Sequence, residues 1–347
     1  MRFASAILGW FLAASAIHAG PVSVSVFGLF HPQELIVSPA AGDRLTITSG
    51  AESLPVEGGQ RLRLARQGTT VSVSAGGRNS SAASVSAKPS STAGGFVLEA
   101  PGKIRREFRG ELTVRVRDGS LEAVVVLDLE TAVAAVVAAE GGAHPAAALE
   151  AQAVAARSYL SASGGRHTGY QFCDTTHCQY LADPPPPGSP SSLAADRTRG
   201  LVLAYRGTLF AALYSRACGG ETHTLADIGL SDTVFPYRRV PCPVCSREEI
   251  SWVSKRPAGD VAEILAKPGN EGARLEVVRR LGWSAVPGDR YKIRREGDRV
   301  RIEGSGEGHG VGLCQRGAIG LARQGWSFRD ILAYYFPDSS LVGLPAN

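Results

Sequence analysis

The stretch TAVAAVVAAEGGAHPAAALEAQAVAARSYL at residues 131–160 decides the fold. Its first half is rich in Ala and Val and ends in one acid, Glu140, and the Gly-Gly pair that follows is typical of a helix end. Pro145 stands where a first helical position belongs, because that position needs no N–H donor. Small and apolar residues then recur at helical spacing, at Leu149, Ala153, Ala156 and Leu160. The stretch predicts two helices, the second with a face that packs closely.

Glu140 is predicted at the C-terminal end of a short buried helix. The negative end of the helix dipole disfavours a carboxylate there, and apolar surroundings raise the pKa of a carboxyl group by desolvation. A carboxyl group that stays protonated near neutral pH is what a general acid requires. The alternative is that Glu140 is simply the polar residue at which a helix reaches solvent.

The first residues have the composition of a secretory leader. Arg2 precedes an apolar run from Phe3 to Ile17, and Ala19 offers a small residue for cleavage. A retained membrane anchor is the alternative, but the run is shorter than the roughly 20 apolar residues that span a bilayer. We therefore expect residues 1–19 to be a signal peptide. The mature protein is then expected to be exported to a periplasm, cell wall or extracellular space, without a membrane anchor.

Alternating apolar and polar residues predict a β-rich N-terminal region over residues 20–109. Helical patterning follows from residue 129 to 163, and consecutive prolines make residues 183–190 an extended surface loop. Strand patterns return afterwards. We therefore predict an α+β fold, in which the β-rich region precedes a mixed α/β domain over residues 110–347.

The charge of the chain bears on its partners. The net charge of +5 over 347 residues fits a protein that meets an anionic envelope polymer. Nucleic acid is not indicated as a partner, because the sequence has no stripe of interleaved basic and aromatic residues.

Two imidazoles and two thiols lie within twelve residues just after the helical stretch: His167, Cys173, His177 and Cys178. Together they supply four ligands of the kind that hold zinc tetrahedrally. Four protein ligands leave no open position for water, so the predicted zinc is structural. The alternative is a disulfide between Cys173 and Cys178 with two surface histidines, which an exported protein can form.

Four further cysteines are Cys218, Cys242, Cys245 and Cys314. The Cys-x-x-Cys spacing of Cys242 and Cys245 is a metal or redox spacing. A second, four-cysteine metal site suits the count, and two disulfides suit an oxidising compartment. We favour the disulfides, in which Cys218 and Cys314 each pair with one member of the close pair.

The segment AQAVAARSY at residues 151–159 resembles the signature of the SpoIID/LytB family. In that family a Glu before a short Pro-containing turn is the catalytic acid of a peptidoglycan lytic transglycosylase, and this role falls on Glu140. Some members carry a His…Cys…His-Cys cluster at the place of the cluster described above, which favours zinc there. The resemblance implies a glycan-binding groove in residues 110–347.

Three more segments carry the resemblance: SRACGGET at 215–222, PYRRV at 236–240 and GHGVGLCQRGA at 308–318. They resemble the family's Ser-x-x-x-Gly-Gly-x-Thr, Pro-Tyr-Leu-basic-Val and Gly-His-Gly-Val-Gly segments in the same order, with Arg238 at the position where the family usually has Leu. With the signature helix, they imply substrate contacts from Gln152, Arg157, Tyr159, Ser215, Gly219, Gly220, Thr222, Tyr237, Arg239, His309 and Gln315.

The reaction implied by the resemblance cleaves the β-1,4 bond between N-acetylmuramic acid and N-acetylglucosamine and leaves a 1,6-anhydro end. It needs one acid/base carboxyl group, in contrast to the usual glycosidase pair. An ordinary hydrolase with Asp174 or Asp183 as second carboxyl group is one alternative. A different class is also open, because some family members are described as enhancers of a cell-wall amidase that bind without cutting.

Overall fold

The computed structural model describes residues 20–345 except 76, 93, 142–143, 165–166, 176, 232–233, 249, 260–279 and 283. The signal peptide predicted at residues 1–19 lies outside the described residues.

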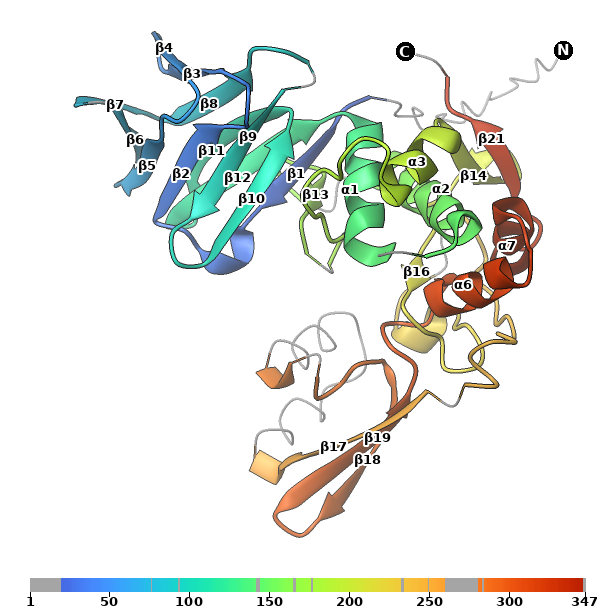
Figure 1. Ribbon diagram of the computed structural model, residues 1–347. Helices are drawn as coiled ribbons and strands as arrows, with labels where there is room; N and C mark the ends of the chain where they lie inside the picture. Colours follow the sequence, from blue (N-terminus) through green and yellow to red (C-terminus); the bar gives the residue numbers. More distant parts are fainter. Residues whose placement is uncertain are drawn as a thin grey trace, which may run out of the picture.

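Two β-sheets, whose strands all precede the helices except β13, share one hydrophobic core (Figure 1). The seven-stranded sheet has the order β13-β1-β12-β11-β8-β3-β4, and the six-stranded sheet has the order β10-β9-β2-β5-β6-β7. Apolar side chains alternate along strands such as β2 and β3, so that one face of each sheet is buried. The strand bounds are β1 (Val22–Val26), β2 (Glu34–Pro39), β3 (Leu45–Ser49), β4 (Glu52–Val56), β5 (Leu62–Gln67), β6 (Thr70–Ala75), β7 (Arg78–Ala82), β8 (Ser84–Pro89), β9 (Gly95–Ala100), β10 (Ile104–Arg109), β11 (Glu111–Arg117), β12 (Ser120–Leu127) and β13 (Phe172–Cys173).

β11 and β12 belong to the sheet that β1 begins. β12 pairs with β1, with Val125 opposite Val24, and β11 pairs with β8, with Val114 opposite Val85. The boundary predicted at residue 109 therefore falls inside one core, and the β-rich region extends to Leu127. Strand alternation looks the same on both sides of residue 109, so it carries no information about which strands pair.

Helix α2 is the centre of the remaining structure (Figure 1). The helix bounds are α1 (Leu129–Gly141), α2 (Ala146–Ala162), α3 (Pro190–Arg197), α6 (Gln315–Arg323) and α7 (Phe328–Tyr335). One face of α2 lies in the core of the β-sheets through Leu149, Ala153, Ala156 and Leu160, the four residues whose spacing predicted it. The opposite face lies in a second core with α6 and α7, through Ala148, Ala151, Val154 and Ala155. A helix that is apolar on both faces is a buried helix, as α2 is.

The remaining strands of the described residues form three small sheets. β14 (Leu201–Tyr205) pairs with β15 (Thr208–Leu209) and β21 (Ser340–Gly343), and β16 (Tyr214–Ser215) lies parallel to β20 (Leu313–Cys314). The third sheet, which we call the arm, extends away from the helices (Figure 1). Its strands are β17 (Ser251–Pro257), β18 (Arg290–Glu296) and β19 (Arg299–Ser305). Short 3-10 helices lie at Gly28–Phe30 and Ala226–Ile228.

The predicted proline-rich loop ends one residue earlier than expected. Pro190 already belongs to α3, and Ser189 caps that helix by accepting a hydrogen bond from Ser192 N (3.3 Å). Among the described residues, no helix has both the length and the apolar character needed to cross a membrane.

Candidate active-site cleft

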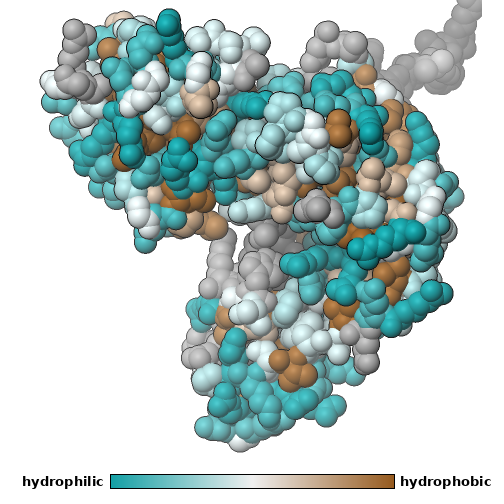
Figure 2. Space-filling model, viewed as in Figure 1, coloured by the Kyte–Doolittle hydropathy of each residue, from teal (hydrophilic) through white to brown (hydrophobic). Residues whose placement is uncertain are grey.

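Glu140 lies in the last turn of α1, and its side chain lines a cavity of about 530 Å³. In the view of Figure 2 the molecule is hollowed between the β-rich part and the arm, whose visible face is largely hydrophilic. The cavity is lined by Glu140, Tyr159, Cys178, Gln179, Tyr180, Leu213, Tyr214, Ser215, Arg216, Ser284, Pro287, Asp289, Glu307, Gly308 and His309. Of the predicted substrate contacts, Tyr159, Ser215 and His309 are therefore brought together with Glu140.

Burial raises the pKa of Glu140 above its ordinary value, as the sequence predicted. Two features oppose that rise: a hydrogen bond that Gln315 Nε2 donates to Glu140 Oε2 (3.3 Å), and the positive charge of Arg216. Desolvation is the largest of the three effects, so the protonated form is more favoured than in an exposed glutamate. A partly buried carboxyl group with a raised pKa in a cavity is suited to act as a general acid.

Gln152 and Gln315 lie on the other side of Glu140. They line a second cavity of about 20 Å³, together with His144 and Ile319. Gln315 Nε2 also lies 3.4 Å from Gln152 Oε1, so the two amides and the carboxyl group form one polar cluster. Gln315 contacts Glu140 directly and Gln152 contacts Gln315, and neither glutamine lines the large cavity.

Tyr214 and Ser215 reach the cavity from β16. The pKa of Tyr214 is well above its ordinary value because of burial and the nearby carboxyl group of Glu140, so its hydroxyl group remains a donor. Ser215 is buried, and its Oγ has no hydrogen-bond partner within the described part of the chain. A buried polar atom without a partner is costly unless a ligand or water satisfies it.

His309 and Tyr159 are held by the fold in different ways. His309 Nδ1 accepts a hydrogen bond from Val311 N (3.1 Å), so a neutral imidazole carries its proton on Nε2. Tyr159, on α2, is buried, and its ring centroid lies 5.9 Å from that of Phe172 in β13.

Seven polar residues that line the cavity were not predicted from the sequence: Gln179, Tyr180, Tyr214, Arg216, Ser284, Asp289 and Glu307. Gln179 is buried, and neither its Oε1 nor its Nε2 has a hydrogen-bond partner among the described residues. Arg216 pairs with Glu307 at 2.9 Å. Gln179 directly follows Cys178, and Arg216 directly follows Ser215, so both are neighbours of predicted residues. A neighbouring position in the sequence does not tell whether a side chain points into the cavity.

The candidates for a second carboxyl group also differ from the prediction. Asp174 is buried and pairs with Arg106 (3.2 Å), and Asp183 accepts a hydrogen bond from Glu107 N (3.2 Å). Neither lines the cavity, whereas Asp289 and Glu307 do. Proximity in sequence to the helical stretch misled the prediction, because the carboxyl groups in the cavity come from the residues just before β18 and just after β19, much later in the chain.

Arg157, a predicted substrate contact, does not line the cavity. The side chain is fully buried, and its guanidinium binds both carboxylate oxygens of Glu130 on α1 (2.9 and 2.6 Å). It also donates to the carbonyl oxygens of Ala195 and Leu201 at 3.1 Å each. Arg157 thus joins α2 to α1, α3 and β14, and has a structural role.

Tyr237 and Thr222 also serve the fold and not the cleft, contrary to prediction. The Tyr237 hydroxyl donates to the carbonyl oxygen of Ala211 and accepts from Leu213 N (3.0 Å), while its ring packs edge-on against Phe235. Thr222 Oγ1 donates to the Arg238 carbonyl oxygen (3.1 Å) and is 1% exposed. Tyr237 therefore fixes the segment that enters β16, and its ring is not available to stack on a sugar.

The last three predicted contacts also lie outside the cavity lining. Arg239 is exposed and pairs with Glu221 (3.3 Å) and Asp227 (2.6 Å). Gly219 and Gly220 have positive φ, and a Cβ on Gly219 would lie 2.8 Å from the backbone nitrogen of Gly306. The close backbone approach that the Gly-Gly pair permits is thus to another segment of the protein.

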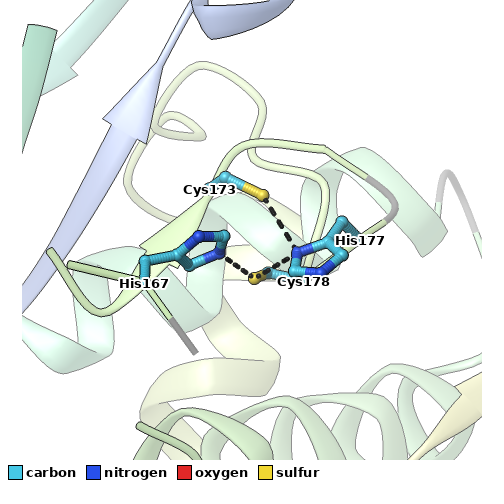
Figure 3. Close-up of side chains that lie close together, drawn as sticks. All are labelled: His167, Cys173, His177 and Cys178. Atoms are coloured by element: carbon cyan, nitrogen blue, oxygen red, sulfur yellow. Dashed lines mark hydrogen bonds between the residues drawn. The ribbon is translucent and has the colours of Figure 1, made fainter. Parts of the chain in front are cut away.

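The predicted zinc ligands converge in the structure. The ligand atoms of His167, Cys173, His177 and Cys178 all lie within 4.8 Å of one another (Figure 3). His167 Nε2 lies 3.2 Å from Cys178 Sγ, and His177 Nδ1 lies 3.7 Å from Cys173 Sγ. The pKa of Cys173 is lowered to about 4, chiefly by its interaction with Cys178, so a thiolate is favoured. Two imidazoles and two thiols at one point fit a tetrahedral metal ion.

The other four cysteines also converge at one point, as the four-cysteine metal site, the alternative to two disulfides, requires. None of the six cysteines, all of them described, forms a disulfide. The sulfur atoms of Cys218, Cys242, Cys245 and Cys314 lie within 4.8 Å of one another, and all four residues are buried. The parallel pairing of β16 with β20 brings the first and last of these cysteines together, and the sequence did not indicate that pairing.

Comparison with known proteins identifies the helical part of the chain. Residues 117–205 match the family described as stage II sporulation protein (SpoIID), which is the family that the sequence motifs predicted. The match contains Glu140, α2 and the His-Cys cluster, whereas Ser215, His309 and Gln315 lie beyond it.

Two relatives extend the comparison. An uncharacterized protein of Brachyspira hyodysenteriae is 26% identical over 229 residues, which cover 57% of this chain and 62% of that protein. The amidase enhancer of Bacillus subtilis is 24% identical over 278 residues, which cover 56% of this chain and 38% of that protein. The chain therefore spans less than two thirds of the length of either relative.

Proposed function

We propose that this protein is an exported peptidoglycan lytic transglycosylase and that Glu140 is its acid/base. The observation that carries this proposal is the raised pKa of Glu140 in a cavity of about 530 Å³, a volume suited to sugar rings. The SpoIID match over residues 117–205 supports the choice of a wall glycan as substrate.

The proposed chemistry needs one carboxyl group. Protonated Glu140 donates its proton to the oxygen that links muramic C1 to the next sugar, and the C1–O bond breaks. The resulting Glu140 carboxylate then accepts the proton of the muramic C6 hydroxyl group as that oxygen bonds to C1. Glu140 ends in its starting protonation state, and the product is a 1,6-anhydro sugar.

Buried polar atoms of the cavity supply the proposed glycan contacts. Ser215 Oγ and both amide atoms of Gln179 have no partner within the described residues, so sugar hydroxyl or acetamido groups would satisfy them. Tyr214, His309 and Arg216 add donors in the same cavity. Arg216 also suits a substrate that carries a carboxylate, as muramic acid does.

The His-Cys cluster is proposed to hold a structural zinc ion. His167, Cys173, His177 and Cys178 would supply all four ligands, so that no position is left for a reacting water. Cys178 and Gln179 both line the cavity, and the metal would fix this wall of the cleft.

The experiment incubates purified peptidoglycan, with and without its stem peptides, with the wild type and with Glu140→Gln. Mass spectrometry of the released fragments then distinguishes the reactions. Anhydro-muramic products from the wild type alone are expected. Reducing ends would instead indicate hydrolysis, and Glu307→Gln and Asp289→Asn would then identify the second carboxyl group, since both residues line the cavity.

The second candidate is a non-catalytic enhancer of a cell-wall amidase, favoured by the similarity to the Bacillus subtilis amidase enhancer. The assay for it measures release of stem peptides by a purified amidase in the presence of this protein. An enhancer keeps its effect with Glu140→Gln and releases no glycan fragments. That result, together with pelleting of both the wild type and Glu140→Gln with the wall, would overturn the transglycosylase proposal.

A further inference from the structure

The four-cysteine cluster is built from three separate segments of the chain. Cys218 follows β16, Cys242 and Cys245 lie in one turn, and Cys314 ends β20. All four side chains are buried, with exposed fractions of 2% or less. Their four sulfur atoms lie within 4.8 Å of one another, which two separate disulfides do not require.

Hydrogen-bond donors surround these sulfur atoms. Cys314 Sγ accepts from Cys218 N and from Gly317 N, and Cys242 Sγ accepts from Cys245 N, each at 3.4 Å. The Tyr335 hydroxyl lies 3.3 Å from Cys242 Sγ. Hydrogen bonds to an ionised acceptor are the strong ones, so these donors are placed to stabilise thiolates.

Gly317 is packed closely against Tyr335 and Cys242. A Cβ at this position would lie 1.9 Å from the Tyr335 hydroxyl and 2.7 Å from Cys242 Sγ. A side chain there would displace the hydroxyl group from the sulfur. The first turn of α6 therefore requires a residue without a Cβ for the contact to exist.

We propose that Cys218, Cys242, Cys245 and Cys314 bind one zinc ion, in addition to the ion proposed for the His-Cys cluster. Zinc–thiolate bonds of about 2.3 Å in a tetrahedron place sulfur atoms about 3.8 Å apart. Cys245 Sγ and Cys314 Sγ are 3.5 Å apart, close to that spacing and much farther than a bonded sulfur pair of about 2.05 Å. Four sulfur ligands at one point favour zinc among the divalent metals.

The ion would hold one wall of the cleft. Cys314 is the register partner of Ser215 in the β16–β20 pair and directly precedes Gln315. Cys218 lies three residues after Ser215. The metal would thus fix a cavity-lining serine and the amide that contacts Glu140, and this role does not depend on which reaction the cleft performs.

The decisive experiment counts thiols and metal in the full chain purified from an oxidising compartment. We expect two zinc ions per chain by elemental analysis, and six alkylated cysteines after unfolding with a chelator and no reductant. Only two alkylated cysteines and a mass lowered by four hydrogens would show two disulfides and overturn the proposal. This measurement needs no variant and is independent of glycan cleavage.

Matched variants assign each ion. Cys245→Ser is expected to lose one zinc ion and keep the other, and His177→Ala is expected to do the same at the other cluster. Cobalt substitution of the wild type supplies a readout that does not depend on folding of the variants, because thiolate-to-cobalt absorption scales with the number of Co–S bonds. Intensity for six such bonds supports the proposal, and intensity for two would contradict it.

Discussion

Gln315 Nε2 donates a hydrogen bond to Glu140 Oε2 at 3.3 Å, across 175 positions of the chain. Glu140 lies in the last turn of α1, and Gln315 is the first residue of α6, so the contact joins two helices that are far apart in the sequence. The bond favours the ionised carboxyl group and opposes the effect of burial on its pKa. The acidity of Glu140 is therefore set by a balance between desolvation and a residue distant in sequence.

Glu140→Gln is expected to lower kcat by at least about 100-fold, because a positioned general acid contributes about 10²–10⁴. Fold and wall binding should persist, since an amide fills the same space. The assay is fragment release from peptidoglycan, with Glu221→Gln, an exposed acid outside the cavity, as the matched control. Full activity of Glu140→Gln would remove Glu140 from the mechanism.

The same variant should alter the pH dependence of stability. The pKa of Glu140 is raised in the folded state, so the folded protein binds this proton more tightly than the unfolded chain. Wild-type stability then falls as pH rises from the ordinary Glu pKa through the folded value. The Tm advantage of Glu140→Gln over the wild type should therefore grow over that range. A constant difference in Tm would show that the pKa is not raised.

Gln315→Leu should move the alkaline limb of the kcat/KM–pH profile to higher pH. Without its hydrogen bond the ionised carboxyl group loses stabilisation, so the pKa of the acid rises further. Arg216→Gln should act in the same direction, because it removes a positive charge that lowers this pKa. A shift to lower pH in either variant would contradict the proposed balance.

Gln179→Leu is expected to raise KM about five- to thirty-fold, as loss of one or two hydrogen bonds to substrate implies. Its Tm should not fall, because neither amide atom has a partner in the described residues of the free protein. Steady-state kinetics and thermal unfolding test both parts. An unchanged KM with a lowered Tm would show that Gln179 is a structural residue.

Arg157→Met should destabilise the fold by about 3–5 kcal/mol, because it leaves the carboxylate of Glu130 in a buried pair without its partner. Where the variant still folds, its KM should match the wild type. Urea unfolding measures the loss. Arg239→Ala is the matched control, since that arginine is exposed and should change stability little.

Tyr237→Phe should cost about 1–3 kcal/mol, because Leu213 N and the Ala211 carbonyl oxygen both lose a partner. Activity should fall as well, since this segment leads into β16 and positions Ser215. Unfolding and kinetics are measured on the same sample. Loss of activity at full stability would instead indicate direct contact with the substrate.

The features that the sequence predicted correctly are local ones. The helix pair and the convergence of His167, Cys173, His177 and Cys178 depend on residues within a few turns or one loop. Of the residues predicted from the motif resemblance, only some line the cavity. Ser215 and His309 line the cavity, whereas Arg157 and Tyr237 are buried structural residues. A sequence motif contains both the residues that keep the cleft in shape and those that contact the ligand. Resemblance to the motif therefore does not tell which of the two roles a residue has.

The sequence by itself predicted that Glu140 lies at the C-terminal end of an apolar helix, because helix periodicity and apolar content can be read within a short segment. The tertiary structure decided between a buried carboxyl group with a raised pKa and one that reaches solvent, because it buries Glu140. Only the tertiary structure decided which groups meet that carboxyl group. Gln315, Arg216 and the cavity-lining Gln179 come from three later segments. The same holds for the four-cysteine cluster, which depends on the pairing of β16 with β20. These long-range contacts depend on which strands and helices pack together. The alternation or spacing of residues within one segment does not predict that packing.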